Sequence, residues 1–158
     1  MTPTHQPTDT MSKQDRYACV LKQIAAVISD EQDMIANMAN TAAILHQSFD
    51  FWWTGFYIVR GEELVLGPFQ GPVACTRIKK GKGVCGTAWE RKQTVVVPNV
   101  HLFKGHIACS SESQSEIVVP LSVENKVTAV LDIDSRHLDT FDDTDRQWLE
   151  RITQLLMQ

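Results

Sequence analysis

The chain has 158 residues, of which 43% are hydrophobic and 22% charged, and its formal net charge is −4. That length suits a single soluble domain with its own core. The acidic balance, with no Lys/Arg run longer than two residues, argues against nucleic acid as a partner. No segment approaches the ~18 consecutive apolar residues needed to cross a bilayer, so we expect no membrane partner either.

The first 12 residues are polar and rich in Thr and Pro, and they lack the basic and apolar regions of a signal peptide. We therefore expect a disordered tail at 1–12, one domain at 13–158 and a cytoplasmic location. Four cysteines in a reducing compartment are expected to be thiols at rest rather than a disulfide framework.

Both ends of the domain are predicted to be helical. Residues 12–29 carry apolar side chains at helical spacing, which predicts a first helix. Ser29 and Gln32 have the spacing of a capping box and should begin a second helix that runs to about His46. A last amphipathic helix is predicted from about Asp142.

Strand patterns fill the middle of the chain. The predicted strands are 51–59, 63–67, 73–78, 94–97 and a final hairpin formed by 116–125 and 126–134. Helices at both ends of a run of hairpins predict an α+β fold. We expect one central antiparallel sheet, with the terminal helices on one face and a pocket covered by a loop on the other.

Residues 98–115 show no periodicity, although they include His101, His106 and Cys109. A loop of this length inside a compact domain is usually a lid, a binding loop or disordered. Two histidines and a cysteine favour a lid or binding loop, so we expect this segment to form the wall of a site.

The final hairpin brings carboxyl groups to one face of the sheet. If Val123 pairs with Val127, Glu116 lies opposite Asp134, and Asp132 shares their face. The opposite face then carries the core residues Ile117, Val119, Leu121, Ala129, Leu131 and Ile133. Two carboxylates about 5 Å apart repel each other unless one keeps its proton or a cation lies between them. The alternative is an acidic strand face exposed to solvent.

Three cysteines are candidates for redox chemistry. Cys109 ends the irregular loop, and Cys75 lies in the third predicted strand. Cys85 lies near the start of a predicted short helix, whose N-terminus would lower the pKa of the thiol. Spacing alone leaves open which two of them pair. Cys19, beside the apolar face of the first helix, is expected to be an inert core residue.

Two other motifs are rejected as sites. Residues 81–86 match G-x-G-x-x-G, but the segment that follows is too short for a dinucleotide-binding helix. Cys75, Cys85, His106 and Cys109 together could form a zinc site, but structural zinc usually uses closely spaced cysteine pairs that this chain lacks. We therefore expect neither a metal nor a cofactor.

Several motifs carry a family resemblance from about residue 15 onward. They are FWWTGFY at 51–57, LGPFQGPVACTRI at 66–78, GKGVCGTAW at 81–89, GHIACSSESQSEIVVPL at 105–121 and VLDIDS at 130–135. With these motifs the chain closely resembles the free methionine-(R)-sulfoxide reductases, a branch of the GAF-domain superfamily.

The resemblance implies a GAF fold, often as a homodimer, and an enzyme that reduces free methionine (R)-sulfoxide with electrons from thioredoxin. It also implies that Cys109 is the nucleophile and Cys75 the resolving cysteine, with Cys85 as an alternative or auxiliary thiol. The competing hypothesis is a GAF module that senses a small ligand or redox state without turnover.

The resemblance further implies that Glu116, Asp132 and Asp134 bind the substrate, with Trp53 and Tyr57 lining the pocket. The chemistry of the residues agrees with these roles. A sulfoxide oxygen leaves poorly until it is protonated, and the crowded Glu116/Asp134 pair is suited to share one proton. The remaining negative charge suits an ammonium group, and an aromatic wall suits a methyl group. The alternative for the two aromatic residues is plain core packing.

Overall fold

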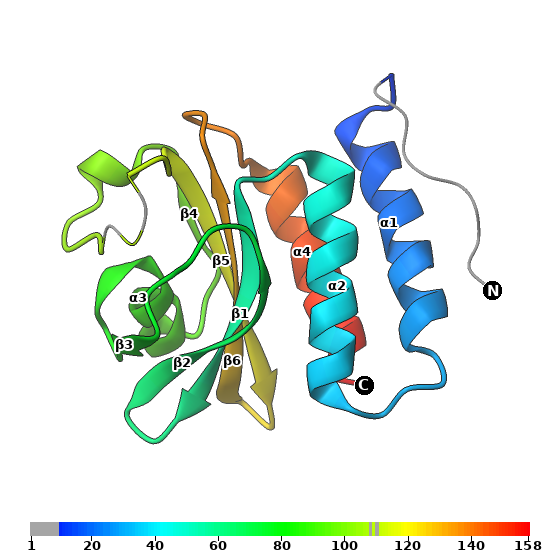
Figure 1. The fold of residues 1–158 in the computed structure, drawn as a ribbon, viewed down its shortest axis with the longest axis horizontal. Helices are drawn as coiled ribbons and strands as arrows, with labels where there is room; N and C mark the ends of the chain where they lie inside the picture. Colours follow the sequence, from blue (N-terminus) through cyan, green and yellow to red (C-terminus); the bar gives the residue numbers. More distant parts are fainter. Residues whose placement is uncertain (1–9, 108, 110) are drawn as a thin grey trace.

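The computed structural model describes residues 10–107, 109 and 111–158. Of the tail expected at 1–12, residues 1–9 lie outside the described residues. Figure 1 shows α2 (Met34–Phe49) and α4 (Asp143–Leu156) packed on one face of a single sheet, and α1 (Lys13–Ile28) packed outside them. The short helix α3 (Gly83–Arg91) and the long loop lie on the opposite face. The predicted α+β arrangement, with terminal helices on one side, is confirmed.

The helical layer is built from α1 (Lys13–Ile28), α2 (Met34–Phe49) and α4 (Asp143–Leu156). The prediction that α2 begins at Ser29 is wrong. Ser29 ends α1 and its hydroxyl donates to the Ala26 carbonyl, whereas the Asp33 carboxylate accepts from the backbone N–H of Ala36. A carboxylate satisfies a free N–H at a helix start at least as well as a hydroxyl does, so Asp33 is the N-cap.

A buried polar cluster joins the first and last helices. The Asp145 carboxylate is 1% exposed and accepts hydrogen bonds from Tyr17 Oη at 2.6 Å and Lys13 Nζ at 2.7 Å. It also accepts from the backbone N–H of Asp142, completing the capping box that starts α4. A buried carboxylate is tolerated here because several donors surround it.

All neighbouring strands of the six-stranded sheet pair antiparallel, in the order β3-β2-β1-β6-β5-β4. Their bounds are β1 Trp53–Arg60, β2 Glu63–Gln70, β3 Arg77–Lys79, β4 Val95–Val97, β5 Ser115–Val123 and β6 Lys126–Ser135. The connections include α3 (Gly83–Arg91) and a short 3-10 turn, Val100–Leu102.

The third strand is shorter than predicted, and Cys75 does not lie in it. β3 begins at Arg77, and residues 71–76 are irregular. Gly71 has φ +130°, and Pro72 has no backbone N–H for a strand ladder. These two residues end β2 and leave Cys75 in an irregular segment.

The predicted pairing of Glu116 with Asp134 is confirmed, but the turn of that hairpin is different. Val123 pairs with Lys126, not with Val127. The turn has only two residues, at 124–125, both with positive φ, a geometry that matches the twist of antiparallel strands. A register shift between Leu121 and Ser122 then restores the predicted pairing further along the strands.

Alternation along β5 and β6 divides the buried residues between two clusters. The core residues predicted from this hairpin, Ile117, Val119, Leu121, Ala129, Leu131 and Ile133, are all buried beneath α1, α2 and α4. On the other face, Val118 and Val130 pack with residues of α3. Glu116 and Asp132 are each only 6% exposed on that face, so the alternative of a solvated acidic strand is wrong.

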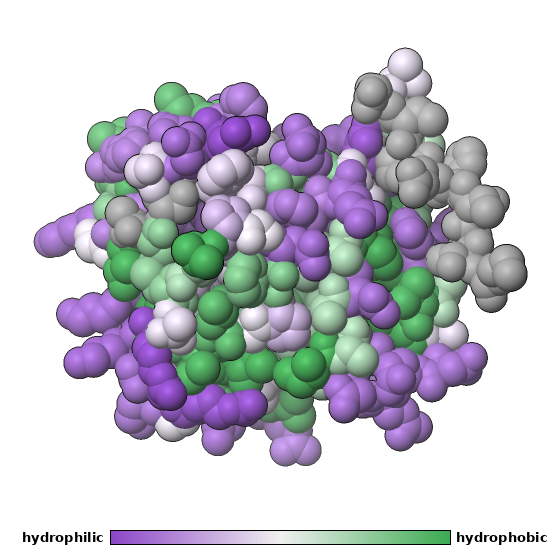
Figure 2. All heavy atoms as spheres, viewed as in Figure 1, coloured by the Kyte–Doolittle hydropathy of each residue, from purple (hydrophilic) through white to green (hydrophobic). Residues whose placement is uncertain are grey.

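The surface carries an apolar groove between the start of α2 and the β1–β2 hairpin. Met34, Ile35 and Met38 of α2 face Ile58 and Val59 of β1 there. Figure 2 shows hydrophobic atoms gathered on this part of the face, while hydrophilic residues surround it. Across the part of the chain that the structure describes, no helix is both long and apolar enough to span a membrane.

Replacing Tyr17 with Phe should lower the free energy of unfolding by about 2 kcal/mol, because buried Asp145 loses a donor. Urea unfolding checks this. As a control, Arg146→Ala removes an exposed ion pair with Asp143 and should leave the urea midpoint unchanged. Equal shifts in the two variants would contradict a stabilising role for the buried cluster.

Candidate active site

A pocket lies between the sheet, α3 and the long loop. It is lined by Trp53, Tyr57, Val73, Ala74, Ile78, Lys82, Gly83, Val84, Cys85, His106, Ile107, Cys109, Ser113, Glu116, Asp132 and Asp134. Every residue predicted for the site lines it except Cys75, which is bonded to the lining residue Cys109. The expected pocket under a loop is therefore present.

Strand register places the three carboxyl groups in the pocket. Glu116 of β5 lies directly opposite Asp134 of β6, and Asp132 lies two residues before Asp134 on the same face. On the other side of β6, Trp53 of β1 pairs with Asp134. The central three strands thus hold the carboxyl groups beside the aromatic wall.

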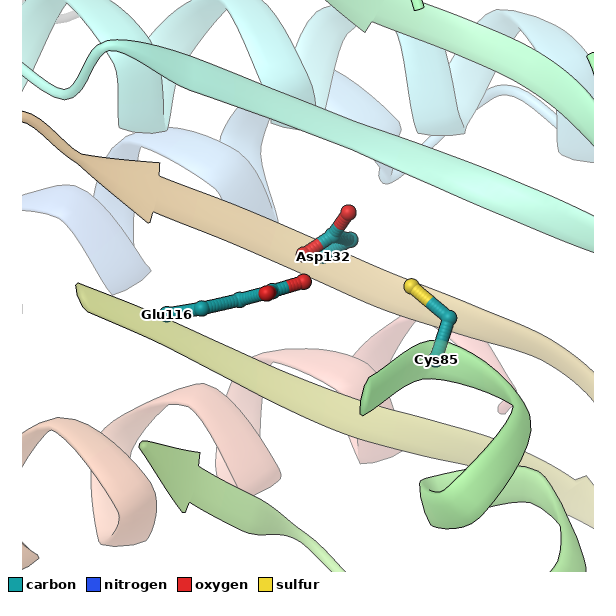
Figure 3. Close-up of side chains that lie close together, drawn as sticks. All are labelled: Cys85, Glu116 and Asp132. Carbon is teal, nitrogen blue, oxygen red and sulfur yellow. The ribbon is translucent and has the colours of Figure 1, made fainter. Parts of the chain in front are cut away.

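Figure 3 shows Cys85 pointing from α3 toward Glu116 and Asp132. The ligand atoms of these three buried residues all lie within 4.8 Å of one another. Oδ1 of Asp132 is buried and has no hydrogen-bond partner among the described residues. A thiol and two carboxyl groups at this spacing could hold a small divalent cation, and the carboxyl groups suit an ammonium group equally well.

This cluster differs from the zinc set considered from the sequence. That set needs four free ligands, but Cys75 and Cys109 form a disulfide with a Cα–Cα distance of 5.5 Å. In this state only Cys85 and His106 of the set could serve as ligands.

Burial and crowding make the carboxyl groups weak acids. Burial, reinforced by the charge of Asp134, raises the pKa of Glu116 to about 8. The pKa of Asp132 is raised well above its ordinary value by burial and by Glu116, and that of Asp134 by burial and by Asp132. At neutral pH the cluster therefore keeps protons, as expected for facing carboxyl groups.

The prediction of a lowered pKa for Cys85 is wrong. Cys85 lies in the first turn of α3, but its side chain is only 3% exposed. Burial raises the pKa of the thiol, and the charges of Asp132 and Glu116 raise it further. These effects outweigh the helix N-terminus, so Cys85 is a protonated thiol in this site.

The aromatic wall has both packed and polar contacts. Trp53 and Tyr57 stack with ring centroids 5.8 Å apart and are 4% and 2% exposed. Nε1 of Trp53 donates to the carbonyl of Pro72 at 3.1 Å, and the Tyr57 hydroxyl donates to the carbonyl of Cys75 at 2.8 Å. The two side chains thus pack in the cluster beneath α3 and also hold the backbone of residues 72–75.

The long loop forms one wall of the pocket, as predicted. Ile107 lies against Gly83, the first residue of α3, where φ is +62° and an added Cβ would come within 3.1 Å of the Ile107 side chain. The Ser113 hydroxyl donates to Oδ1 of Asp134 at 3.0 Å. No sequence pattern distinguishes Ser113 within the serine-rich run at 110–115, and Ile107 has no apolar neighbours at helical or strand spacing that would mark it.

His106 faces Glu116, with Nε2 and Oε2 3.7 Å apart. Burial lowers the pKa of His106 and raises that of Glu116. Both groups are therefore neutral over much of the range near neutral pH, and the contact is a polar neighbourhood rather than an ion pair.

Comparison with known proteins agrees with the fold and the site described above. The GAF domain profile matches residues 28–158. GAF domain-containing protein A of Dictyostelium discoideum is 53% identical over 146 residues, 92% of each chain. Free methionine-R-sulfoxide reductase of Escherichia coli is 46% identical over 143 residues, covering 90% of this chain and 87% of that protein. The chain belongs to the free methionine-R-sulfoxide reductase family.

A solved structure supports this membership over nearly the whole chain. The X-ray structure of free methionine-R-sulfoxide reductase from Neisseria meningitidis, in complex with its substrate, matches with a TM-score of 0.95 and 50% identity. The match covers 99% of this chain and 93% of that chain. The GAF fold and the family resemblance inferred from the motifs are confirmed, and the family places the chain among the oxidoreductases.

The raised pKa of Glu116 should make stability depend on pH. Between pH 4.5 and about 8 the unfolded chain releases this proton while the folded protein keeps it, so the free energy of unfolding falls as the pH rises. Glu116→Gln should reduce that fall, leaving the part due to Asp132 and Asp134. Urea unfolding of the oxidised protein near pH 4.5 and near pH 8 measures this fall in the free energy of unfolding.

The control for this experiment is Glu62→Gln, which removes an exposed carboxylate on the β1–β2 turn and should keep the full fall with pH. The same pH dependence in Glu116→Gln and in the unmodified protein would contradict a proton held on Glu116.

Proposed function

We propose that the protein reduces free methionine (R)-sulfoxide to methionine, using Cys109 as the nucleophile and Cys75 as the resolving cysteine. The observation that carries this proposal is the Cys75–Cys109 disulfide at a pocket lined by three buried carboxyl groups. The names of the E. coli and N. meningitidis relatives, the latter solved with its substrate, support the choice of substrate.

The pocket suits two groups of a free amino-acid sulfoxide, its ammonium group and its methyl group. The negative charge that remains on the cluster of Glu116, Asp132 and Asp134 can neutralise the ammonium group of the substrate. Buried Oδ1 of Asp132 can accept a hydrogen bond from that group. The stacked rings of Trp53 and Tyr57 offer an apolar wall for the methyl group.

Proton supply follows from the same crowding. Reduction of the sulfoxide breaks its S–O bond. This bond breaks more easily once the oxygen is protonated. Glu116, with a pKa of about 8, keeps a proton at neutral pH and faces Asp134 across the strands. We assign this pair as the proton donor to the oxygen.

The reaction then proceeds in two steps on the protein. The Cys109 thiolate adds to the sulfur of the protonated sulfoxide. The hydroxyl group then passes from that sulfur to Cys109 while the new S–S bond and the substrate S–O bond break, which leaves a sulfenic acid on Cys109 and releases methionine. The Cys75 thiol next attacks the sulfenic sulfur, so that an S–S bond forms, the S–O bond breaks and water leaves. Because burial keeps Cys85 protonated and Cys75 is the residue bonded to Cys109, we assign Cys85 an auxiliary role.

An external dithiol must reopen the disulfide. We propose thioredoxin as this reductant and the cytoplasm as the place where the protein works. Under this proposal the enzyme relieves oxidative stress by recycling oxidised methionine. A homodimer stays a prediction from the family.

Three single cysteine variants should separate the chemical roles. In a single-turnover assay, Cys109→Ser should release no methionine because the nucleophile is lost. Cys75→Ser should release about one methionine per subunit and then stall, because the sulfenic acid cannot be resolved. Cys85→Ser should continue to cycle with thioredoxin. Quenched samples analysed for methionine measure all three.

Cys19→Ser, which alters a cysteine outside the pocket, is the matched control and should cycle like the unmodified protein. Normal cycling of Cys75→Ser with thioredoxin would contradict the assignment of Cys75 and point to Cys85 as the resolving residue.

A further inference from the structure

The segment that carries Cys75 is held in place chiefly by side chains of the pocket. Residues 71–76 belong to neither helix nor strand, since β2 ends at Gln70 and β3 begins at Arg77. The segment follows Gly71, where an added Cβ would lie 2.9 Å from Cδ1 of Trp53. It therefore runs directly against the Trp53 ring.

Three carbonyl groups fix this segment. The carbonyl of Pro72 accepts from Nε1 of Trp53, and that of Cys75 accepts from the Tyr57 hydroxyl. The third, at Thr76, accepts from the backbone N–H of Leu66. Two of the three donors are side chains that also line the pocket, and both stand on β1, the strand next to β6.

We propose that Trp53 and Tyr57 are positioning residues for the resolving thiol as well as walls of the pocket. Both side chains line the cavity, while their polar atoms hold the segment at Pro72 and at Cys75 itself. The clamp keeps the Cys75 sulfur within reach of Cys109, which is 34 residues away along the chain. The sulfenic-acid step in this inference rests on the proposed function, whereas the clamp on the disulfide does not.

The clamp affects one step of the reaction in particular. Formation of the S–S bond, with loss of the oxygen as water, requires Cys75 to find the Cys109 sulfur, and its rate follows the fraction of time in which the two are in reach. Attack of Cys109 on the substrate needs no contribution from Cys75. Loosening the segment should therefore slow the second step more than the first.

Tyr57→Phe and Trp53→Phe test this because each keeps an aromatic ring and removes one donor. Rapid-quench assays follow methionine release, and trapping with dimedone followed by mass spectrometry gives the lifetime of the Cys109 sulfenic acid. In each variant, disulfide formation should slow relative to methionine release by about threefold to tenfold, the effect of losing one hydrogen bond. The double variant should show a larger ratio.

The matched control is Tyr17→Phe, which removes a buried tyrosine hydroxyl on the helical side of the sheet. General loss of stability would change both steps alike, whereas loss of the clamp changes their ratio. Equal factors for the two steps in Tyr57→Phe and Trp53→Phe would overturn the proposal.

A second measurement does not depend on the substrate. Equilibration of the protein with glutathione gives the equilibrium constant for formation of the Cys75–Cys109 disulfide. This constant should fall by a similar threefold to tenfold in Tyr57→Phe and in Trp53→Phe and stay unchanged in Tyr17→Phe. If the unmodified protein releases no methionine, the proposed function fails while this arm still tests the clamp. An unchanged constant in both Tyr57→Phe and Trp53→Phe would overturn the positioning role. If one of these variants does not fold, the result from the other stands as the test.

Discussion

The pairing of Glu116 with Asp134 on a buried face of the sheet is the constraint on which the rest of the site depends. Ionised carboxylates cannot be buried side by side without a cation or a proton. The protein meets this by keeping protons on the cluster, where burial and the charge of Asp134 raise the pKa of Glu116 to about 8. Such a cluster suits a ligand that brings both a positive charge and an oxygen in need of a proton.

The two faces of the sheet have different tasks. Beneath the helices, alternating residues of β5 and β6 form an apolar core, and the Lys13–Asp145–Tyr17 cluster joins α1 to α4. On the other face, buried polar groups oppose folding and Cys85 sits protonated among them. The stability gained on the helical side offsets the cost of holding this reactive pocket.

Much of this arrangement could be predicted from the sequence, because strand alternation alone assigns Glu116, Asp132 and Asp134 to one face. The predictions that were wrong depend on contacts between residues that are far apart in the sequence. Cys85 lies at a helix N-terminus, as expected, but the sequence does not show that carboxyl groups and burial surround it. The irregular segment around Cys75 depends on bonds from Trp53 and Tyr57, which lie about 20 residues earlier in the chain. The two-residue turn at 124–125 is matched by a compensating register shift between Leu121 and Ser122, directly after Pro120, a residue type that often marks bulges in strands.

We propose that the carboxyl cluster recognises a free ammonium group while Cys109 attacks the neighbouring sulfoxide sulfur. The most direct measurement is turnover with thioredoxin as reductant, comparing free methionine (R)-sulfoxide with its (S) epimer and with N-acetylmethionine (R)-sulfoxide. We expect turnover of the free (R) epimer and at least a hundredfold lower kcat/KM for the N-acetyl compound, on the order of a lost charged interaction in a buried site. Equal turnover of the free and acetylated compounds, or none of either free epimer, would contradict it.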